Sequence, residues 1–248
     1  RTETQEFRDD ASLDVETMVD TLRSTKGRSY SACPSVADWE RAFGEDDDVL
    51  AFTITSGLSG SFRAACAAKL NCEENSPSRR ICIIDSLSTG PEIVLLIEKA
   101  VSELSAGADF DAVCRSVQDY QRRTHLIFAL ESLHNLAQNG RVGKLAAAAA
   151  GMLGIRAVGT TSDEGTLDLL GKCRGRKRTV DFLQEEMERL GYTGGCVRIG
   201  HCRNTDSTGE LRTAILHRFP GANIRIYTLR GLCSYYAECG GVLVGFEA

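Results

Sequence analysis

The chain has 248 residues, of which 42% are hydrophobic and 25% are charged, and its formal net charge is −5. This composition is typical of a globular protein with one large or two ordinary domains, and the acidic balance disfavours nonspecific binding to nucleic acid. The longest apolar runs are too short to span a bilayer, and no secretory signal pattern is present. We therefore expect a cytoplasmic protein without a nucleic-acid partner.

The 10 cysteines are scattered singly along the chain. They form no C-x-x-C pair and no Cys/His spacing typical of a zinc site. The nearest approach to a metal cluster is His201-Cys202 together with Cys196. We expect reduced, buried thiols in a cytoplasm, and no metal.

The beginning of the chain predicts a polar segment followed by two helices. Residues 1–12 are polar and predict an exposed loop or an edge strand. Apolar residues at helical spacing predict a helix over 13–22. Ser35 and Asp38 form a predicted capping box that opens a second helix over 36–43.

Two repeats of strand, turn and helix follow. Apolar runs predict buried strands over 49–53 and 80–85, each leading through a hydroxyl-rich turn into a helix, over 62–69 and 93–106 respectively. This order indicates a parallel sheet with right-handed crossovers. Ligands of such sheets lie beyond the carboxyl ends of the strands, so we expect both turns, and the loop with Ser31, to gather at that edge.

The pattern of the sequence changes after Gly90, and this change predicts a second lobe. We predict an α/β fold with a parallel-sheet, Rossmann-like N-terminal lobe over residues 1–88 and a second α/β sandwich lobe over residues 89–248. Residues 166–170 and 171–173 are predicted to pair as a hairpin. The other elements expected after residue 106 are strands over 125–130, 155–160, 196–201, 223–228 and 242–246, and helices over 109–122, 133–138, 145–153, 179–190 and 210–218.

The turn after the first buried strand, residues 53–62, is the candidate binding site. Small hydroxyl side chains and two glycines, Gly57 and Gly60, lead directly into a helix. The free N–H groups of a first helical turn point at a bound anion, and glycines let a ligand approach the backbone. A carboxylate or a phosphate is the expected ligand. The alternative is a well-capped helix with Ser59 as its N-cap.

Five stretches resemble, in order and rough spacing, segments of the DegV family of bacterial lipid-binding proteins. Residues 55–61, TSGLSGS, resemble the family's S-S-x-L-S-G-T turn, and residues 133–144, LHNLAQNGRVGK, are similar to its L-x-x-L-x-x-G-G-R-I-G-K segment. The other three resemblances are residues 31–35 to a T-S-Q-P-S loop, residues 154–158 to an N-I-K-P-I strand, and residues 171–178 to a G-K-x-R-x-x-K-K hairpin.

The resemblance implies two lobes with a long-chain fatty acid in a buried tunnel between them. At the matching positions, Ser31 and Ser59 would hold the carboxylate. Gly60 would give a backbone N–H, and Arg141 would supply positive charge near the head group. The family further implies a non-catalytic carrier without a cofactor, which presents the fatty acid to a separate fatty acid kinase for acyl-phosphate formation and makes at most transient contact with a membrane surface.

The chain departs from the family pattern in two places. The family's first strand, which ends in T-D-S, is absent from the sequence, so we expect the sheet of the first lobe to lack that strand. Many members carry G-x-H-T-G-P-G near the C-terminus, and the corresponding residues 235–241 here read YYAECGG. The histidine that some members place at the head group is therefore missing.

Elementary energetics assign different roles to the two ends of such a ligand. Burial of a sixteen-carbon chain contributes about 12 kcal/mol of transfer free energy before ordering costs. Each hydroxyl donor to the carboxylate adds about 1.5–3 kcal/mol. The tunnel should therefore set affinity, and Ser31 and Ser59 should set orientation. The small residues 146–151 suit either a tunnel wall or tight helix packing, whereas Met152 and Leu153 suit a core.

Two other functions compete with lipid binding. Residues 57–61 are close to the G-x-S-x-G motif, so Ser59 could be the nucleophile of a serine hydrolase acting on a small ester, or the turn could bind a small anion. The candidate bases are His125, His134, His201 and His217, none of which lies in a recognisable partner motif. The second competing function is that of a nucleotide- or nucleic-acid-binding module, but residues 140–144, GRVGK, lack the spacing of a Walker A motif. The basic residues within 172–178 predict a solvated segment or a docking surface for an acidic partner.

Overall fold

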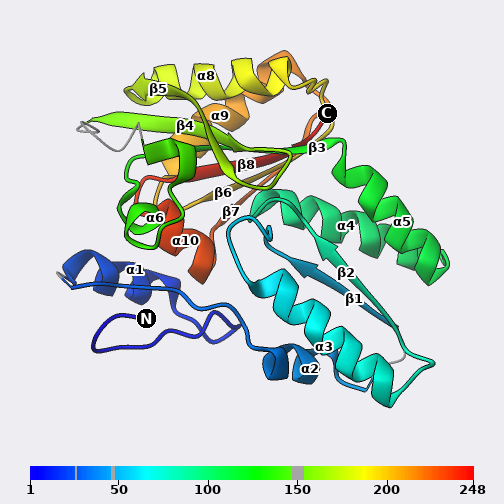
Figure 1. Ribbon diagram of the computed structural model, residues 1–248. Helices are drawn as coiled ribbons and strands as arrows, with labels where there is room; N and C mark the ends of the chain where they lie inside the picture. Colours follow the sequence, from blue (N-terminus) through cyan, green and yellow to red (C-terminus); the bar gives the residue numbers. More distant parts are fainter. Residues whose placement is uncertain (26, 46–47, 147–153) are drawn as a thin grey trace.

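Two β-sheets of unequal size organise the molecule (Figure 1). The computed structural model describes residues 1–25, 27–45, 48–146 and 154–248. The smaller sheet pairs two parallel strands, β1 (Asp48–Thr53) and β2 (Arg80–Asp85). The larger sheet has six strands in the order β5-β4-β3-β8-β6-β7. These strands are β3 (Thr124–Leu130), β4 (Ile155–Thr161), β5 (Leu167–Arg174), β6 (Cys196–His201), β7 (Asn223–Thr228) and β8 (Val242–Glu247).

The smaller sheet has an apolar layer on each face, because successive side chains of a strand point to opposite sides. In β1, Val49 and Ala51 pack with the helices α2 (Val36–Phe43) and α3 (Ser61–Asn75). Leu50 and Phe52 pack on the other face against the remaining two helices. Those are α4 (Pro91–Ser105) and α5 (Phe110–Gln121). The predicted strands and the predicted parallel pairing are confirmed.

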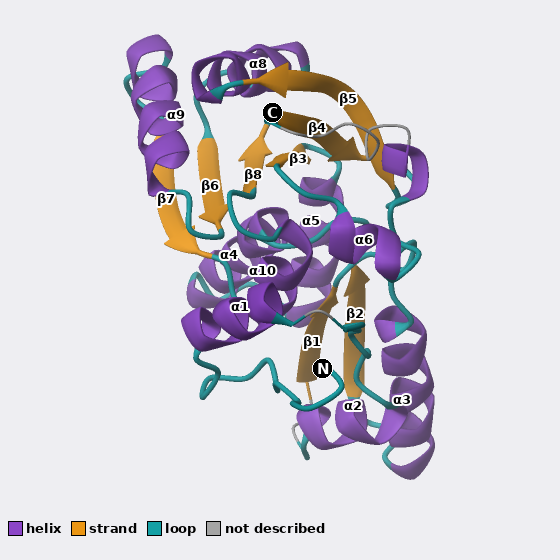
Figure 2. Ribbon diagram, turned by 90° about the vertical axis from the view of Figure 1, so that its left-hand side faces the viewer, coloured by secondary structure: helices purple, strands orange, loops and turns teal. Residues whose placement is uncertain are grey.

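The larger sheet is also covered on both faces (Figure 2). Along β3, Leu126, Phe128 and Leu130 belong to one apolar cluster, and Ile127 and Ala129 belong to the other. The outer face packs against α8 (Arg176–Arg189) and α9 (Thr205–Arg218). The inner face, which is turned toward the smaller sheet, packs against α1 (Val15–Ser24), α6 (His134–Gln138), α10 (Gly231–Ala237) and the 3₁₀ helix η1 (Gly143–Leu145). The second α/β sandwich lobe is thus confirmed.

Helix α4 lies between the two sheets and contacts both (Figure 1). Its N-terminus approaches β8 so closely that a Cβ at Gly245 would lie 2.5 Å from the Glu92 nitrogen. Near its middle, Glu98 accepts hydrogen bonds from two nitrogens of the almost fully buried guanidinium of Arg198 in β6. Because α4 belongs to both cores, the predicted division at residues 88 and 89 stays a prediction.

Two predicted elements need correction, and one helix is not predicted by the sequence pattern. Residues 166–173 do not form a hairpin by themselves, since residues 167–173 lie in the single strand β5, which pairs with β4. Helix α9 begins at Thr205, five residues before the predicted start, because Asn204 caps it by accepting from the Ser207 N–H. Helix α10 was not predicted at all. Of the predicted helix over 145–153, residues 147–153 lie outside the described residues.

The polar N-terminal segment is a loop that contacts α10, not an edge strand. The carboxylate of Asp9 accepts from the N–H groups of Gly231 and Leu232 at 3.0 and 2.7 Å. These are the first residues of α10, so Asp9 satisfies two of the N–H groups that a helix start leaves unpaired. Within the described residues, no helix combines the length and the apolar character that crossing a bilayer would require.

Candidate functional site

The turn between β1 and α3 is the element on which the candidate site is built. Its backbone closes on itself, because the N–H groups of Leu58 and Ser59 both donate to the Thr55 carbonyl at 3.2 Å. Helix α3 begins at Ser61 with Gly60 as its N-cap, so the interpretation of Ser59 as the N-cap is wrong by one residue. The Ser59 hydroxyl nevertheless accepts from the Ser61 N–H at 3.2 Å, which satisfies one donor of the first helical turn.

The β4–β5 hairpin of the larger sheet contacts this turn. The buried hydroxyl of Thr55 donates to the Gly165 carbonyl at 2.9 Å and accepts from the Gly57 N–H at 3.0 Å. A Cβ at Gly57 would lie 2.8 Å from the Gly165 carbonyl oxygen, and one at Gly165, where φ is +73°, would overlap the Thr55 hydroxyl. Glycine is therefore required at both positions. The two sheets meet at the candidate site.

Asp85, at the end of β2, brings the two hydroxyl-rich turns together. One of its carboxylate oxygens accepts from the Ser56 N–H at 3.0 Å and from the Leu87 N–H at 3.2 Å. The Thr55 N–H donates to the Ser88 carbonyl at 2.8 Å. The prediction that both turns gather beyond the carboxyl ends of the parallel strands is confirmed.

The loop that contains Ser31 is held by two tyrosines of α10. The Ser31 hydroxyl lies 2.7 Å from the Tyr236 hydroxyl, and the buried Ser29 hydroxyl lies 2.8 Å from the Tyr235 hydroxyl. The Ser29 N–H also donates to the side-chain carbonyl of Gln138 at 3.0 Å. Residues near the two ends of the sequence therefore form one side of the site.

Arg141 connects the turn with the tyrosines. Its Nε donates to the Leu58 carbonyl at 3.1 Å, and a second guanidinium nitrogen donates to the Asn139 carbonyl at 2.7 Å. The guanidinium carbon lies 5.9 Å from the centre of the Tyr236 ring. This geometry is that of a cation–π contact. A cavity of about 340 Å³ opens beside Arg141 and is lined also by Gly57, Leu58 and Leu167.

The four predicted site residues thus belong to one neighbourhood. Arg141 contacts the turn that carries Ser59 and Gly60. A Cβ at Gly60 would lie 3.4 Å from the sulfur of Cys33, two residues beyond Ser31, so the loop also reaches the turn. The roles of the four residues as carboxylate ligands stay predictions.

Tyr236 is the site residue that sequence reasoning missed. The available signal was the YYAECGG segment, which departs from the family pattern where other members carry a histidine. Tyr236 is partly buried, and this burial raises the pKa of its phenol, against the smaller opposing effects of Ser31 and the Arg141 charge. The phenol is therefore protonated at neutral pH and can donate a hydrogen bond.

An apolar cluster begins directly behind the polar groups. Leu58 of the turn, Val142 next to Arg141, and Tyr236 all pack against the inner face of the larger sheet. The fully buried Leu145 and the buried Phe128 lie within this cluster. The polar groups of Ser31, Ser59, Gly60 and the cationic Arg141 thus form a polar rim in front of a large apolar interior. An amphipathic anion requires this combination.

The hydrolase alternative gains no geometric support from the histidines. In the part of the chain that the structure describes, no hydrogen bond joins Ser59 to a histidine. The His125 ring packs 5.5 Å from the Phe246 ring, and His201 accepts from the Asn204 N–H at 3.3 Å. Burial lowers the pKa of both histidines.

The suggested metal cluster around His201 is not assembled. Among the described residues, no group of three His, Cys, Asp or Glu side chains is arranged to hold a metal ion. All ten cysteines are free thiols, of which Cys114, Cys173 and Cys202 are buried and Cys33 is exposed. The expectation of buried thiols therefore applies to only some of them.

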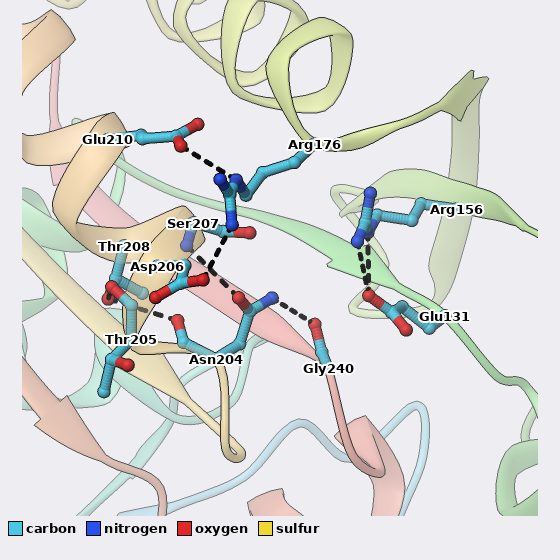
Figure 3. A network of polar contacts seen from close by, with 10 residues as sticks. All are labelled: Glu131, Arg156, Arg176, Asn204, Thr205, Asp206, Ser207, Thr208, Glu210 and Gly240. Atoms are coloured by element: carbon cyan, nitrogen blue, oxygen red, sulfur yellow. Dashed lines mark hydrogen bonds and ion pairs between the residues drawn. The ribbon is translucent and has the colours of Figure 1, made fainter.

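The basic segment over residues 172–178 is divided between the end of β5 and the start of α8. Figure 3 shows Arg176 between Asp206 and Glu210 of α9, with ion-pair distances of 2.7 and 2.8 Å. Arg178 pairs with Glu185 at 2.9 Å. Acidic side chains of this chain thus occupy part of the segment, which favours the interpretation as a solvated surface.

Comparison with known proteins identifies the family. A family model described as "Uncharacterised protein, DegV family" matches residues 1–247. A DegV domain-containing protein of Streptococcus pneumoniae is 42% identical over 243 residues, which cover 98% of this chain and 86% of the relative. A DegV domain-containing protein of Streptococcus pyogenes is 41% identical over 244 residues, which cover 98% of this chain and 87% of the relative.

Two solved structures share the fold at similar identity, each with a TM-score of 0.96. A DegV family protein from Eubacterium eligens, loaded with heptadecanoic acid, is 41% identical, and the match covers 100% of this chain and 90% of that one. The Streptococcus pneumoniae fatty acid kinase (Fak) B3 protein, loaded with linoleic acid, is 42% identical, with coverage of 100% and 88%. The full-length family match and these relatives show that the chain belongs to the DegV family.

Proposed function

We propose that this protein binds a long-chain fatty acid, with the carboxylate at the polar rim and the alkyl chain against the inner face of the larger sheet. Ser31 and Ser59 give hydroxyl donors, Gly60 gives a backbone N–H, and Arg141 gives a positive charge. The observation that carries the proposal is that Arg141, itself bonded to the Leu58 carbonyl, lies where the polar turn meets the apolar cluster.

The relatives support this choice of ligand. Proteins about 41–42% identical to this chain have been solved with heptadecanoic acid and with linoleic acid. A Ruminococcus gnavus DegV family protein, 26% identical, was solved with vaccenic acid. These acids differ in chain length and unsaturation but share a carboxylate and a long alkyl chain. We infer the same ligand class here.

The physical balance agrees with such a ligand. Each methylene removed from water contributes about 0.8 kcal/mol, so the chain supplies most of the affinity. Hydroxyl and guanidinium donors to a carboxylate form charge-assisted hydrogen bonds, which are stronger and more directional than neutral ones. They therefore select the head group and orient it toward the turn.

We further propose that the protein is a non-catalytic carrier that presents the carboxylate to a fatty acid kinase. The kinase would transfer the γ-phosphoryl group of ATP to a carboxylate oxygen, with release of ADP and formation of an acyl-phosphate. The fatty acid kinase (Fak) B3 name of a 42% identical relative supports this role. We place the carrier in the cytoplasm, because its ten free thiols suit a reducing compartment.

Titration of the purified, delipidated chain with hexadecanoic acid by calorimetry tests the binding proposal. We expect saturable binding of one molecule, and at least about a hundredfold weaker binding for the Ser31→Ala/Ser59→Ala double variant, because each lost donor to the charged carboxylate removes about 1.5–3 kcal/mol. A matched control is Ser102→Ala/Ser105→Ala, which removes two exposed hydroxyls from α4 and should bind as the parent does. Equal affinity of both double variants would contradict the assigned roles.

The non-catalytic and carrier roles have separate tests. A fluorophosphonate probe should not label Ser59, because no described hydrogen bond connects that hydroxyl with a histidine base. Labelling that Ser59→Ala abolishes would favour the hydrolase. In a mixture of ATP, fatty acid and a bacterial fatty acid kinase, acyl-phosphate should form only when this chain is added. Equal formation without the chain would exclude the carrier role.

A further inference from the structure

The hydrogen bond between Ser31 and Tyr236 raises a question about the direction of donation. Their oxygens lie 2.7 Å apart, and either can be the donor. A serine hydroxyl has a single hydrogen. If Ser31 donates that hydrogen to Tyr236, Ser31 can only accept a hydrogen bond from a ligand. An ionised carboxylate has no hydrogen to donate, so it would gain no hydrogen bond from Ser31. If Tyr236 donates, the Ser31 hydrogen is free.

The surroundings of Tyr236 favour donation from the phenol. Arg141 lies 5.9 Å from its ring centre and carries only donors, so it does not compete for the phenol hydrogen. The other aromatic contact, with the Tyr235 ring at 4.8 Å, is an edge-to-face contact that involves the ring and not the hydroxyl. Ser31 Oγ is then the acceptor to which the Tyr236 hydrogen is given.

We propose that Tyr236 is a positioning residue for the head group: its hydroxyl donates to Ser31 Oγ and thereby directs the single Ser31 hydrogen toward the fatty-acid carboxylate. This inference rests on the proposed function and adds a physical basis for selectivity between a fatty acid and a neutral long-chain lipid. Ser31 then keeps its single hydrogen for the ligand, and a hydroxyl donor suits a charged acceptor such as a carboxylate. A long-chain alcohol, which is neutral, gains less from the same donor.

The loop has a second attachment that separates positioning from folding. Next to Ser31, Ser29 is bonded through its hydroxyl to Tyr235 and through its N–H to Gln138. These bonds remain when the Tyr236 hydroxyl is removed, so the loop keeps its place. Tyr236→Phe also keeps the ring that faces Arg141. The variant therefore removes only the hydroxyl that fixes the direction of donation.

A double-mutant cycle tests the inference by calorimetric titration with hexadecanoic acid and, in parallel, with hexadecan-1-ol. We expect Tyr236→Phe to weaken acid binding about five- to tenfold and to change alcohol binding less than about twofold. In a Ser31→Ala background the same substitution should have no further effect, because the hydroxyl that Tyr236 orients is gone. Tyr192→Phe, which removes a hydroxyl that donates to the Gly195 carbonyl on the outer face of the larger sheet, is the control and should bind both ligands as the parent does.

The contradicting outcomes are distinct. Losses that add independently in the cycle, or equal losses for acid and alcohol with an unchanged melting temperature, would show that Tyr236 does not act through Ser31. Unchanged acid binding by Tyr236→Phe would also overturn the inference, while the proposed function would stand. A parent chain that binds no hexadecanoic acid would overturn both.

Discussion

The two sides of the candidate site are built in different ways. The turn between β1 and α3 is fixed by backbone hydrogen bonds a few residues apart and by the Gly165 carbonyl that Thr55 contacts. The loop with Ser31 is fixed by side-chain hydroxyls whose partners lie more than 200 residues away in sequence. A turn held largely by its backbone should be rigid, whereas a loop held by several side chains should keep its place but become more mobile when one of them is removed. Substitutions on each side test this contrast.

The largest effect should come from Gly165→Ala, on the side of the turn. The new methyl group would overlap the Thr55 hydroxyl, and φ of +73° is unfavourable for alanine. We expect a loss of about 3 kcal/mol in the free energy of unfolding, by chemical denaturation. Gly107→Ala is the control, because φ there is +81° but no atom lies within 4 Å of the added Cβ. Equal losses for the two variants would mean that the contact with Thr55 does not matter.

Thr55→Val should have the next largest effect. It keeps the shape of the side chain but leaves the Gly57 N–H and the Gly165 carbonyl without their partner. The Gly57 backbone and the Gly165 carbonyl lie so close together that a Cβ at Gly57 would be 2.8 Å from the carbonyl oxygen. We therefore expect a loss of about 2 kcal/mol in unfolding free energy. Weakened fatty-acid binding should accompany it. A variant as stable as the parent would contradict the account of this turn.

Arg141→Met tests the residue that touches both sides. The substitution keeps an aliphatic side chain against the cavity but removes the donor to the Leu58 carbonyl and the charge next to Tyr236. We expect about tenfold weaker binding of hexadecanoic acid and little change in stability. Arg141→Lys should retain part of the affinity, because it keeps the charge but not the planar donor set. If the Arg141→Lys and Arg141→Met variants bind hexadecanoic acid equally weakly, the donor geometry of Arg141 matters for binding and its charge does not.

Tyr235→Phe, on the side of the loop, should cost less stability than Gly165→Ala or Thr55→Val. It removes the partner of the Ser29 hydroxyl and one acceptor of Asn139, but both groups retain another hydrogen bond. We expect a loss of about 1 kcal/mol in unfolding free energy. Hydrogen exchange should increase at residues 29–31 and stay unchanged at residues 55–60. Faster exchange in the turn instead would show that the two sides are not independent.

The same contrast explains which features could be predicted from sequence. The turn is a local signal, because an apolar strand, small hydroxyl residues and glycines stand next to one another, and its position was found to within one residue. The capping box of Ser35 and Asp38 was found for the same reason. The gathering of both turns at one edge followed from the topology of a parallel sheet.

The features that were missed depend on contacts distant in sequence. Nothing in α10 by itself indicates that Tyr236 reaches Ser31, and Asp9, which caps this helix, lies 222 residues away. Gly171 suggested a turn, but it lies inside β5, where the Phe182 ring would lie 3.0 Å from a Cβ at this position. The start of α9 is a local feature instead: its first residues are polar, so the apolar pattern indicates the helix only from Glu210, although Asn204 caps it directly before Thr205.

The most direct test of the account is native mass spectrometry of the purified chain, followed by denaturing extraction of bound lipid. The account predicts a folded protein that carries one additional molecule, released on denaturation with the mass of a long-chain fatty acid, and a lower occupancy in the Ser31→Ala/Ser59→Ala variant. The bare mass of the chain, from a folded protein that also takes up no added fatty acid, would contradict it.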